Sequence, residues 1–257
     1  MPIVYFTGRV LPSAGAIKIT IRDLPTAHWE ETSIGLIMDF TVRIEDSKVA
    51  VECQVNRYQD DDLPHLHMRA IDLARAAIDI FCFANGWGLT VWIDTFIKPD
   101  GAEQFLLAQM PQLAPLCTAF NLAPSGGKIE DVWRIVVGEP AIFMALNDLI
   151  AGITWPHYAP VNCARAIEGI RNMITPLGTD RKQGWPLMRA NLNIEQGYLS
   201  FITDQSTGPR HGDRAFIPGT EVNKTVERSW IVMDRFLEFR KRGNQPLPLV
   251  EFPMLTG

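Results

Sequence analysis

Residues 48–84 contain the change of hydrophobic period that decides the fold class, and they read KVAVECQVNRYQDDDLPHLHMRAIDLARAAIDIFCFA. At the start of this stretch apolar side chains occupy every second position, which predicts a strand with one buried face. From Pro64 to Ala84 the apolar residues recur at steps of three and four, which predicts an amphipathic helix. Pro64 suits the first turn of that helix, and Asn85-Gly86 suits its end. A strand followed by a long helix predicts a mixed α/β N-terminal half.

Other segments of this half alternate apolar and polar residues in the same way, and short turns rich in proline, glycine or acidic residues separate them. Consecutive strands at such short spacing predict antiparallel hairpins. We therefore expect two hairpins before the helix and one strand pair after it, over residues 3–10 with 16–22, 36–43 with 48–57, and 89–97 with 104–107.

Helical spacing dominates the second half of the chain. Residues 121–128, Asn-Leu-Ala-Pro-Ser-Gly-Gly-Lys, have the composition of a linker, and we place the domain boundary there. The sequence thus predicts an α+β domain, an antiparallel sheet with one long helix, over residues 1–125. It predicts an all-α helical bundle with an irregular C-terminal tail over residues 129–257. The expected helices cover 131–137, 141–153, 161–174, 186–204 and 221–242.

The composition of the chain is that of a globular protein, with 257 residues, 47% hydrophobic and 21% charged. The net charge of −5 argues against a protein that coats nucleic acid non-specifically. Its acidic excess lies in residues 1–128, which hold 10 Lys and Arg against 15 Asp and Glu, whereas the remainder holds 14 of each. The N-terminus lacks the pattern of a signal peptide, and no stretch has the roughly 20 apolar residues of a membrane helix, so we expect a cytoplasmic protein without membrane contact.

Four scattered cysteines, without a Cys-x-x-Cys pair, predict buried free thiols at Cys53, Cys82, Cys117 and Cys163. No dinucleotide-binding or phosphate-binding loop is present in the sequence, so we expect no cofactor. Similarly, Trp133, Trp155, Trp185 and Trp230 stand in apolar helical contexts, which favours core packing over base stacking.

A first candidate for chemistry is the run Asp60-Asp61-Asp62 with His65 and His67, because carboxylates and imidazoles bind divalent cations. Acidic residues before a helix are also explained by the positive end of the helix dipole. In addition, His65 and His67 lie about 200° apart on a helix, so they cannot both point at one ion unless the helix begins after them. We therefore expect no metal site.

The second candidate is the loop between the last two predicted helices, Gly208-Pro209-Arg210-His211-Gly212-Asp213-Arg214. An imidazole can exchange the proton of a ribose 2′-hydroxyl, and arginine offers a fork of donors to a phosphate whose charge rises in the transition state. Such a pair suffices for cleavage of RNA without a metal, through a cyclic phosphate. The alternative is an ion-pair network around Arg210, Asp213 and Arg214, with His211 capping a helix end.

At these residues the chain resembles the HEPN superfamily, over about residues 138–243. The resemblance is carried by helix order, by Ala166-Ile167-Glu168-Gly169-Ile170-Arg171-Asn172, by Trp185, and by Pro209-Arg210-His211-Gly212. It implies a helical domain that forms homodimers and cleaves or binds RNA without a metal, as in ribonucleases of toxin and phage-defence systems. His211 and Arg210 are then the expected catalytic residues, and Arg214 is expected to support substrate binding.

One feature departs from that family. Its motif has an arginine five to seven residues before the histidine, and this chain has Asp204, Gln205 and Ser206 there. Only the adjacent Arg210 is available, so whether the chain is an enzyme stays open. The alternative is a non-catalytic dimeric interaction or scaffold protein whose N-terminal domain recognises a ligand or a protein partner.

Overall fold

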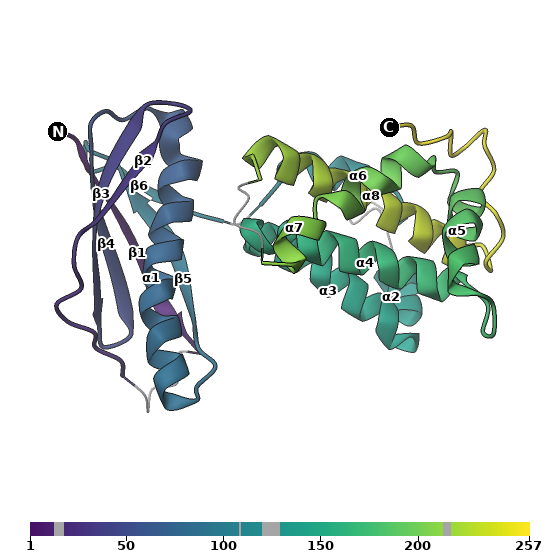
Figure 1. Ribbon diagram of the computed structural model, residues 1–257, viewed down its shortest axis with the longest axis horizontal. Coiled ribbons are helices and arrows are strands. Elements are labelled where there is room, and N and C mark those ends of the chain that lie inside the picture. Colours follow the sequence, from purple (N-terminus) through teal and green to yellow (C-terminus); the bar gives the residue numbers. More distant parts are fainter. Residues whose placement is uncertain (13–17, 108, 120–128, 213–216) are drawn as a thin grey trace. The chain divides into compact units, whose positions relative to one another are not determined.

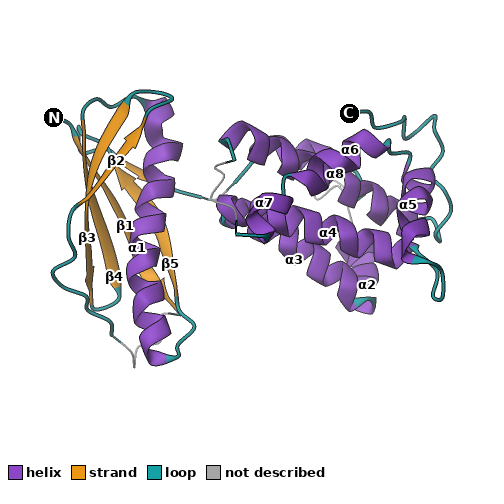
Figure 2. Ribbon diagram, viewed as in Figure 1, coloured by secondary structure: helices purple, strands orange, loops and turns teal. Residues whose placement is uncertain are grey.

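The structure, a computed structural model, describes residues 1–12, 18–107, 109–119, 129–212 and 217–257. It divides into two compact units, Met1–Leu107 and Ala108–Gly257, which we call the N-terminal and C-terminal units. The first is an antiparallel sheet with one long helix, and the second is helical (Figures 1 and 2). The predicted fold class, α+β followed by all-α, is confirmed.

The N-terminal unit contains a six-stranded antiparallel sheet, with α1 lying along one of its faces (Figure 1). The strand order is β2-β3-β4-β1-β5-β6, so β1 is central and pairs with β4 and β5. The predicted hairpin of residues 36–43 with 48–57 is confirmed as β3 and β4, and the predicted pair after the helix as β5 and β6. The bounds are β1 Ile3–Leu11, β2 Ala27–Glu31, β3 Leu36–Glu45, β4 Lys48–Val55, α1 Leu63–Asn85, β5 Thr90–Ile97 and β6 Glu103–Phe105.

Alternation along the strands decides which face of the sheet is buried. Leu36, Met38 and Phe40 of β3 are fully buried, whereas the residues between them are partly exposed. The helix contributes its predicted apolar stripe, including Leu66 and Ile78, to the same core. The opposite face carries the more exposed positions, among them the row Tyr5, Glu52 and Thr41 across β1, β4 and β3.

The predicted hairpin of residues 3–10 with 16–22 is wrong for the described residues. Among residues 18–22, Ile21 forms a single bridge to Ile44, and both sides of β1 are taken by β4 and β5. Ile19 is buried because it packs at the β3–β4 turn, where it exchanges hydrogen bonds with Ser47. The alternation of Ile19 and Ile21 therefore reflects local burial and not a strand. One edge strand of the sheet is β2, which the sequence did not predict.

The C-terminal unit is built around α4, which packs against α3 on one side and α8 on the other. Its apolar face, with Cys163, Ile167 and Ile170, is fully buried because these residues repeat at three- and four-residue steps. The helices are α2 Ile129–Gly138, α3 Pro140–Thr154, α4 Ala159–Ile174, α5 Gly184–Leu192, α6 Gln196–Asp204, α7 Thr207–Arg210 and α8 Gly219–Lys241, with 3-10 turns at Pro111–Leu116, Pro156–Tyr158 and Arg181–Gln183.

The single helix predicted over residues 186–204 is wrong, because the chain breaks between α5 and α6 at Asn193. This residue adopts a φ of 54°, and its amide donates to the carbonyls of Leu247 and Phe252 in the C-terminal tail. The buried Arg235 of α8 donates to the carbonyls of Leu192 and Asn193 at 2.8 Å. The break is therefore held by partners far away in sequence.

The predicted boundary at residues 121–128 lies outside the described residues, and the division between the units falls after Leu107. Leu113 and Ala119 are buried in the core of the C-terminal unit. Asp234 of α8 accepts hydrogen bonds from the backbone N–H groups of Thr118 and Ala119, each at 2.7 Å. The described part of residues 109–119 thus belongs to the helical unit, because α8 supplies partners for its backbone.

Candidate functional site

The candidate loop begins in α7, a single helical turn that follows α6 closely. Arg210 is the last residue of α7, and His211 caps it by donating its backbone N–H to the carbonyls of Thr207 and Gly208. Gly212 follows with a φ of 76°, a conformation that glycine adopts without strain. The turn places Arg210, His211 and Gly212 at the surface of the C-terminal unit.

The guanidinium of Arg210 is not free. Its Nη1 lies 3.0 Å from Oε1 of Glu168, which projects from α4, and the two side chains are 31% and 30% exposed. A pair so close to water is worth about 0.2 to 1 kcal/mol. The predicted alternative, an ion-pair network around this loop, therefore holds for Arg210, whose partner is Glu168 of α4.

His211, the residue after Arg210, is exposed. Because it follows Arg210 directly, the two side chains leave the same turn at the end of α7. The other two charged residues of the loop, Asp213 and Arg214, lie outside the described residues. The turn therefore carries an exposed imidazole and, on the preceding residue, a guanidinium bound to a carboxylate.

Two further cations, on the helix that follows the loop, were not predicted as site residues from the sequence. Lys224 and Arg228 of α8 stand one helical turn apart, and both lie over the ring of Phe201 of α6, at 4.7 and 4.3 Å. Such contacts fasten α6 to α8. Lysine and arginine four residues apart on a predicted helix were the signal, but only the fold reveals the aromatic ring between them.

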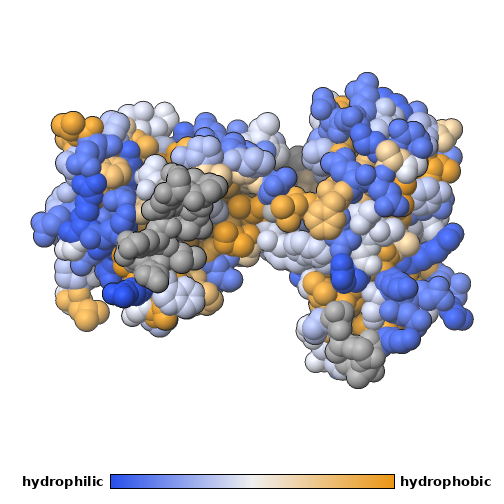
Figure 3. All heavy atoms as spheres, turned by 180° about the vertical axis from the view of Figure 1, so that it is seen from behind, coloured by the Kyte–Doolittle hydropathy of each residue, from blue (hydrophilic) through white to orange (hydrophobic). Residues whose placement is uncertain are grey.

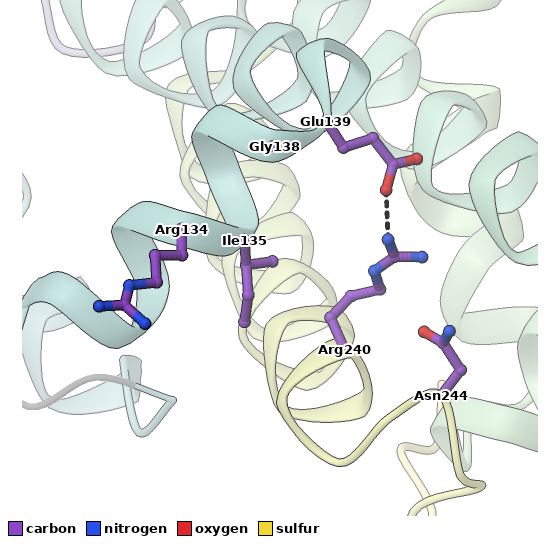
Figure 4. Close-up of a pocket in the computed structure, with 6 residues that line it drawn as sticks. All are labelled: Arg134, Ile135, Gly138, Glu139, Arg240 and Asn244. Carbon is purple, nitrogen blue, oxygen red and sulfur yellow. Dashed lines mark hydrogen bonds and ion pairs between the residues drawn. The ribbon is translucent and has the colours of Figure 1, made fainter.

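A hollow of about 350 Å³ lies elsewhere on the C-terminal unit, at the elbow between α2 and α3 and the end of α8 (Figure 4). Arg240 and Glu139 form an ion pair within it, and Arg134 points away from that pair. Ile135, Gly138 and Asn244 complete its lining. No lining residue belongs to α7, so the hollow and the candidate loop are separate features.

The residues of the first candidate, the possible metal site, are engaged separately. Asp62 is buried and accepts hydrogen bonds from Arg57. Asp60 pairs with Lys98 at 2.7 Å and accepts a hydrogen bond from Tyr58, which lowers the pKa of the Asp60 carboxyl. Within the described ranges, no three His, Cys, Asp or Glu side chains form a group that could hold a metal ion.

His67 faces the core of the N-terminal unit. Its ring stacks on Phe6 at 5.9 Å between centroids and is hydrogen-bonded to the backbone of Ile93. Its Nε2 is buried, and no hydrogen-bond partner for it exists among the described residues. Burial lowers the pKa of His67, although the hydrogen bond to Ile93 opposes this. The neutral imidazole is therefore the form that fits.

Acidification should destabilise the N-terminal unit through His67. In the unfolded chain the His67 imidazole binds a proton at around pH 6.5, whereas in the folded unit its pKa is lower. The free energy of unfolding therefore falls as pH drops below about 6.5. In His67→Gln this dependence should be weaker. Urea unfolding from pH 8 to pH 5 measures it, and His65→Gln, on the same helix, is the control. An unchanged pH dependence in His67→Gln would contradict the assignment.

Apolar side chains are exposed on the outer faces of α2 and α3. Phe143, Met144 and Ile150 of α3 are 52–61% exposed, and Figure 3 shows apolar patches between polar ones on one face of the molecule. Trp133 of α2 is 61% exposed, so core packing, predicted for it, is wrong. Among the described residues, no single helix is long and apolar enough to cross a membrane. The α2–α3 pair meets those criteria only across a bend of 106°.

Family models match both units of the chain. Residues 4–107 match the N-terminal domain of DUF8168, a domain of unknown function, and residues 129–241 match its C-terminal domain. The two matches occur in order along the chain and together cover most of it. No match was found among curated proteins or among solved structures.

Proposed function

The chain belongs to the DUF8168 family, and we propose that it binds RNA through the Arg210–His211 turn of its C-terminal unit, without a metal. The observation that carries the proposal is the contact of Arg210 with Glu168. A guanidinium at the surface already holds an oxyanion at 3.0 Å, which is the geometry that a phosphate oxygen requires. His211, the next residue along the chain, is also exposed.

The resemblance to HEPN proteins supports the same proposal, since it concerns the same turn. Cleavage is the stronger form of the proposal, with His211 as acid and base, Arg210 as phosphate ligand and Arg214 in support. The proposal includes a homodimer, in which two such turns contribute to one site, and a role in defence or as a toxin. Because the net charge of the chain is −5, RNA would be repelled by most of the surface and would bind only at a local basic contact.

Arg210→Ala should weaken binding of a labelled single-stranded RNA by about 3- to 10-fold, because one phosphate contact is lost. The dependence of log Kd on log salt should become shallower by about 0.7, the contribution of one phosphate on a single strand. Fluorescence anisotropy at several salt concentrations measures both quantities.

Arg189→Ala is the matched control, because Arg189 lies on α5 of the same unit and its side chain donates to Gln196. It removes the same charge and should change affinity less than Arg210→Ala. RNA binding by Arg210→Ala that equals wild-type binding in affinity and salt dependence would overturn the proposal, as would a wild-type chain that does not bind RNA.

A second function is favoured by a different observation, the exposed apolar face of α3. Phe143, Met144 and Ile150 repeat at helical spacing on the side away from the core residues Ile142 and Leu149. Such a face supports a non-catalytic interaction protein that dimerises or binds a protein. The face of the sheet opposite α1 in the N-terminal unit would then recognise the ligand or partner. A wild-type chain that does not bind RNA would favour this second function.

A further inference from the structure

The partner of Arg210 projects from α4, a helix packed between α3 and α8. Glu168 is flanked on α4 by Ile167 and, two residues on, by Ile170, both fully buried. Gly169 lies against Ala145 of α3, so α4 has little freedom at this point. The carboxylate of Glu168 thus projects from a well-packed helix, whereas Arg210 extends toward it from a single turn that contains Gly208 and is followed by Gly212.

The basic residue one turn before Glu168 pairs with a different carboxylate. Arg165, one turn earlier on α4, lies 3.5 Å from Asp148 of α3. Among the described residues, Glu168 forms one ion pair, which is the pair with Arg210. The two charges therefore neutralise each other, and an approaching anion meets a guanidinium whose Nη1 is already occupied by a carboxylate.

The exposure of the pair sets how firmly it holds. With each side chain about one third exposed, water solvates the open form, so the contact can exchange without a buried charge being left unpaired. A carboxylate and a backbone phosphate each carry one negative charge and compete for the same N–H donor, so further contacts along the RNA must decide the exchange.

We propose that Glu168 is an intramolecular competitor that occupies the phosphate-binding donors of Arg210 until RNA displaces it. The inference rests on the proposed RNA binding and adds a residue that sets its strength. An anion must displace the Glu168 carboxylate before it can bind Arg210, so isolated anions bind weakly. An RNA backbone that makes further contacts with the protein can displace the carboxylate. Glu168 is a positioning residue, because it acts through Arg210.

Glu168→Gln should bind single-stranded RNA more tightly, by about two- to fivefold, which is the range of an exposed ion pair. Glutamine keeps the length of the side chain and removes the charge that competes with phosphate. In the Arg210→Ala background, Glu168→Gln should give no such gain, because Glu168 then has no guanidinium to occupy. The comparison is between Arg210→Ala and the double variant. Anisotropy titration of a labelled 12-nucleotide RNA with the full chain measures all four proteins.

Glu227→Gln is the matched control, since Glu227 is exposed on α8 of the same unit and has no ion pair among the described residues. An equal gain in Glu227→Gln, or a gain of Glu168→Gln that persists with Arg210→Ala, would reduce the effect to general charge and overturn the inference. If Arg210→Ala weakens binding but Glu168→Gln leaves it unchanged, RNA binding stands and the competitor is rejected. A wild-type chain that does not bind RNA rejects both.

Discussion

Replacing Gly8 by alanine should destabilise the N-terminal unit by about 3 kcal/mol or more, because the new side chain has no space between β1 and β5. A Cβ atom at this position would lie 2.0 Å from the carbonyl oxygen of Trp92 and 2.7 Å from Cα of Ile93. Both are backbone atoms of the neighbouring strand, so they cannot rotate away. The pairing of β1 with β5 is already irregular between Thr7 and Gly8. The variant must therefore separate two central strands.

Gly88→Ala is the matched control, because a Cβ at Gly88 would meet nothing within 4 Å. It adds the same methyl group to the same unit and should change the free energy of unfolding by no more than about 0.5 kcal/mol. Urea unfolding measures the loss, and hydrogen exchange at the amides of β1 and β5 assigns it to the sheet. Equal stability of Gly8→Ala and Gly88→Ala would contradict the close approach of these strands.

The elements predicted well are those whose pattern is complete within one segment. The β3–β4 hairpin follows from alternation on both sides of Asp46 and Ser47, which adopt the positive φ values of a tight turn. The long helix α1 follows from an apolar stripe that starts after Pro64 and ends at Gly86, whose φ is 66°. In both cases local propensity and burial agree, so the sequence alone is sufficient.

The elements missed are decided by distant partners. Strand β2 reads Ala-His-Trp-Glu-Glu, without apolar alternation, and it exists because β3 offers an open edge. The break at Asn193 depends on Leu247, Phe252 and Arg235, more than 40 residues away. Periodicity cannot reveal such partners, because it contains no information on which segments meet.

The candidate site shows the same limit. Arg210 and His211 could be selected from residue type and from their place between helices. The contact with Glu168, 42 residues earlier, required the packing of α7 on α4. Helical spacing alone puts Arg171 with Glu168 on the polar side of α4, yet Arg171 is buried and lies over the ring of Trp185 at 4.7 Å. Helical spacing therefore gave the core of α4 correctly and the surroundings of its polar residues incompletely.

If the proposed RNA binding includes cleavage, His211→Ala should lower the rate by about 10² to 10⁴, the usual contribution of a positioned general acid and base. The imidazole would take the proton of the 2′-hydroxyl while that oxygen attacks the adjacent phosphorus, the bond to the 5′-oxygen would break, and the imidazolium would return the proton to that leaving oxygen. This leaves a 2′,3′-cyclic phosphate and a 5′-hydroxyl. Cleavage should persist in EDTA, and DNA of the same sequence should stay intact because it lacks the nucleophile.

His157→Ala supplies the control, since His157 is exposed in the same unit and lies outside the candidate loop. It should cleave RNA at the wild-type rate. Arg210→Ala should lower the rate together with the affinity, because the guanidinium would hold the phosphate in both the bound and the transition state. Equal cleavage by wild type and His211→Ala would contradict the role of His211 as general acid and base. Binding without cleavage in wild type would leave Arg210 as a ligand for RNA and remove His211 from catalysis, as the missing upstream arginine allows.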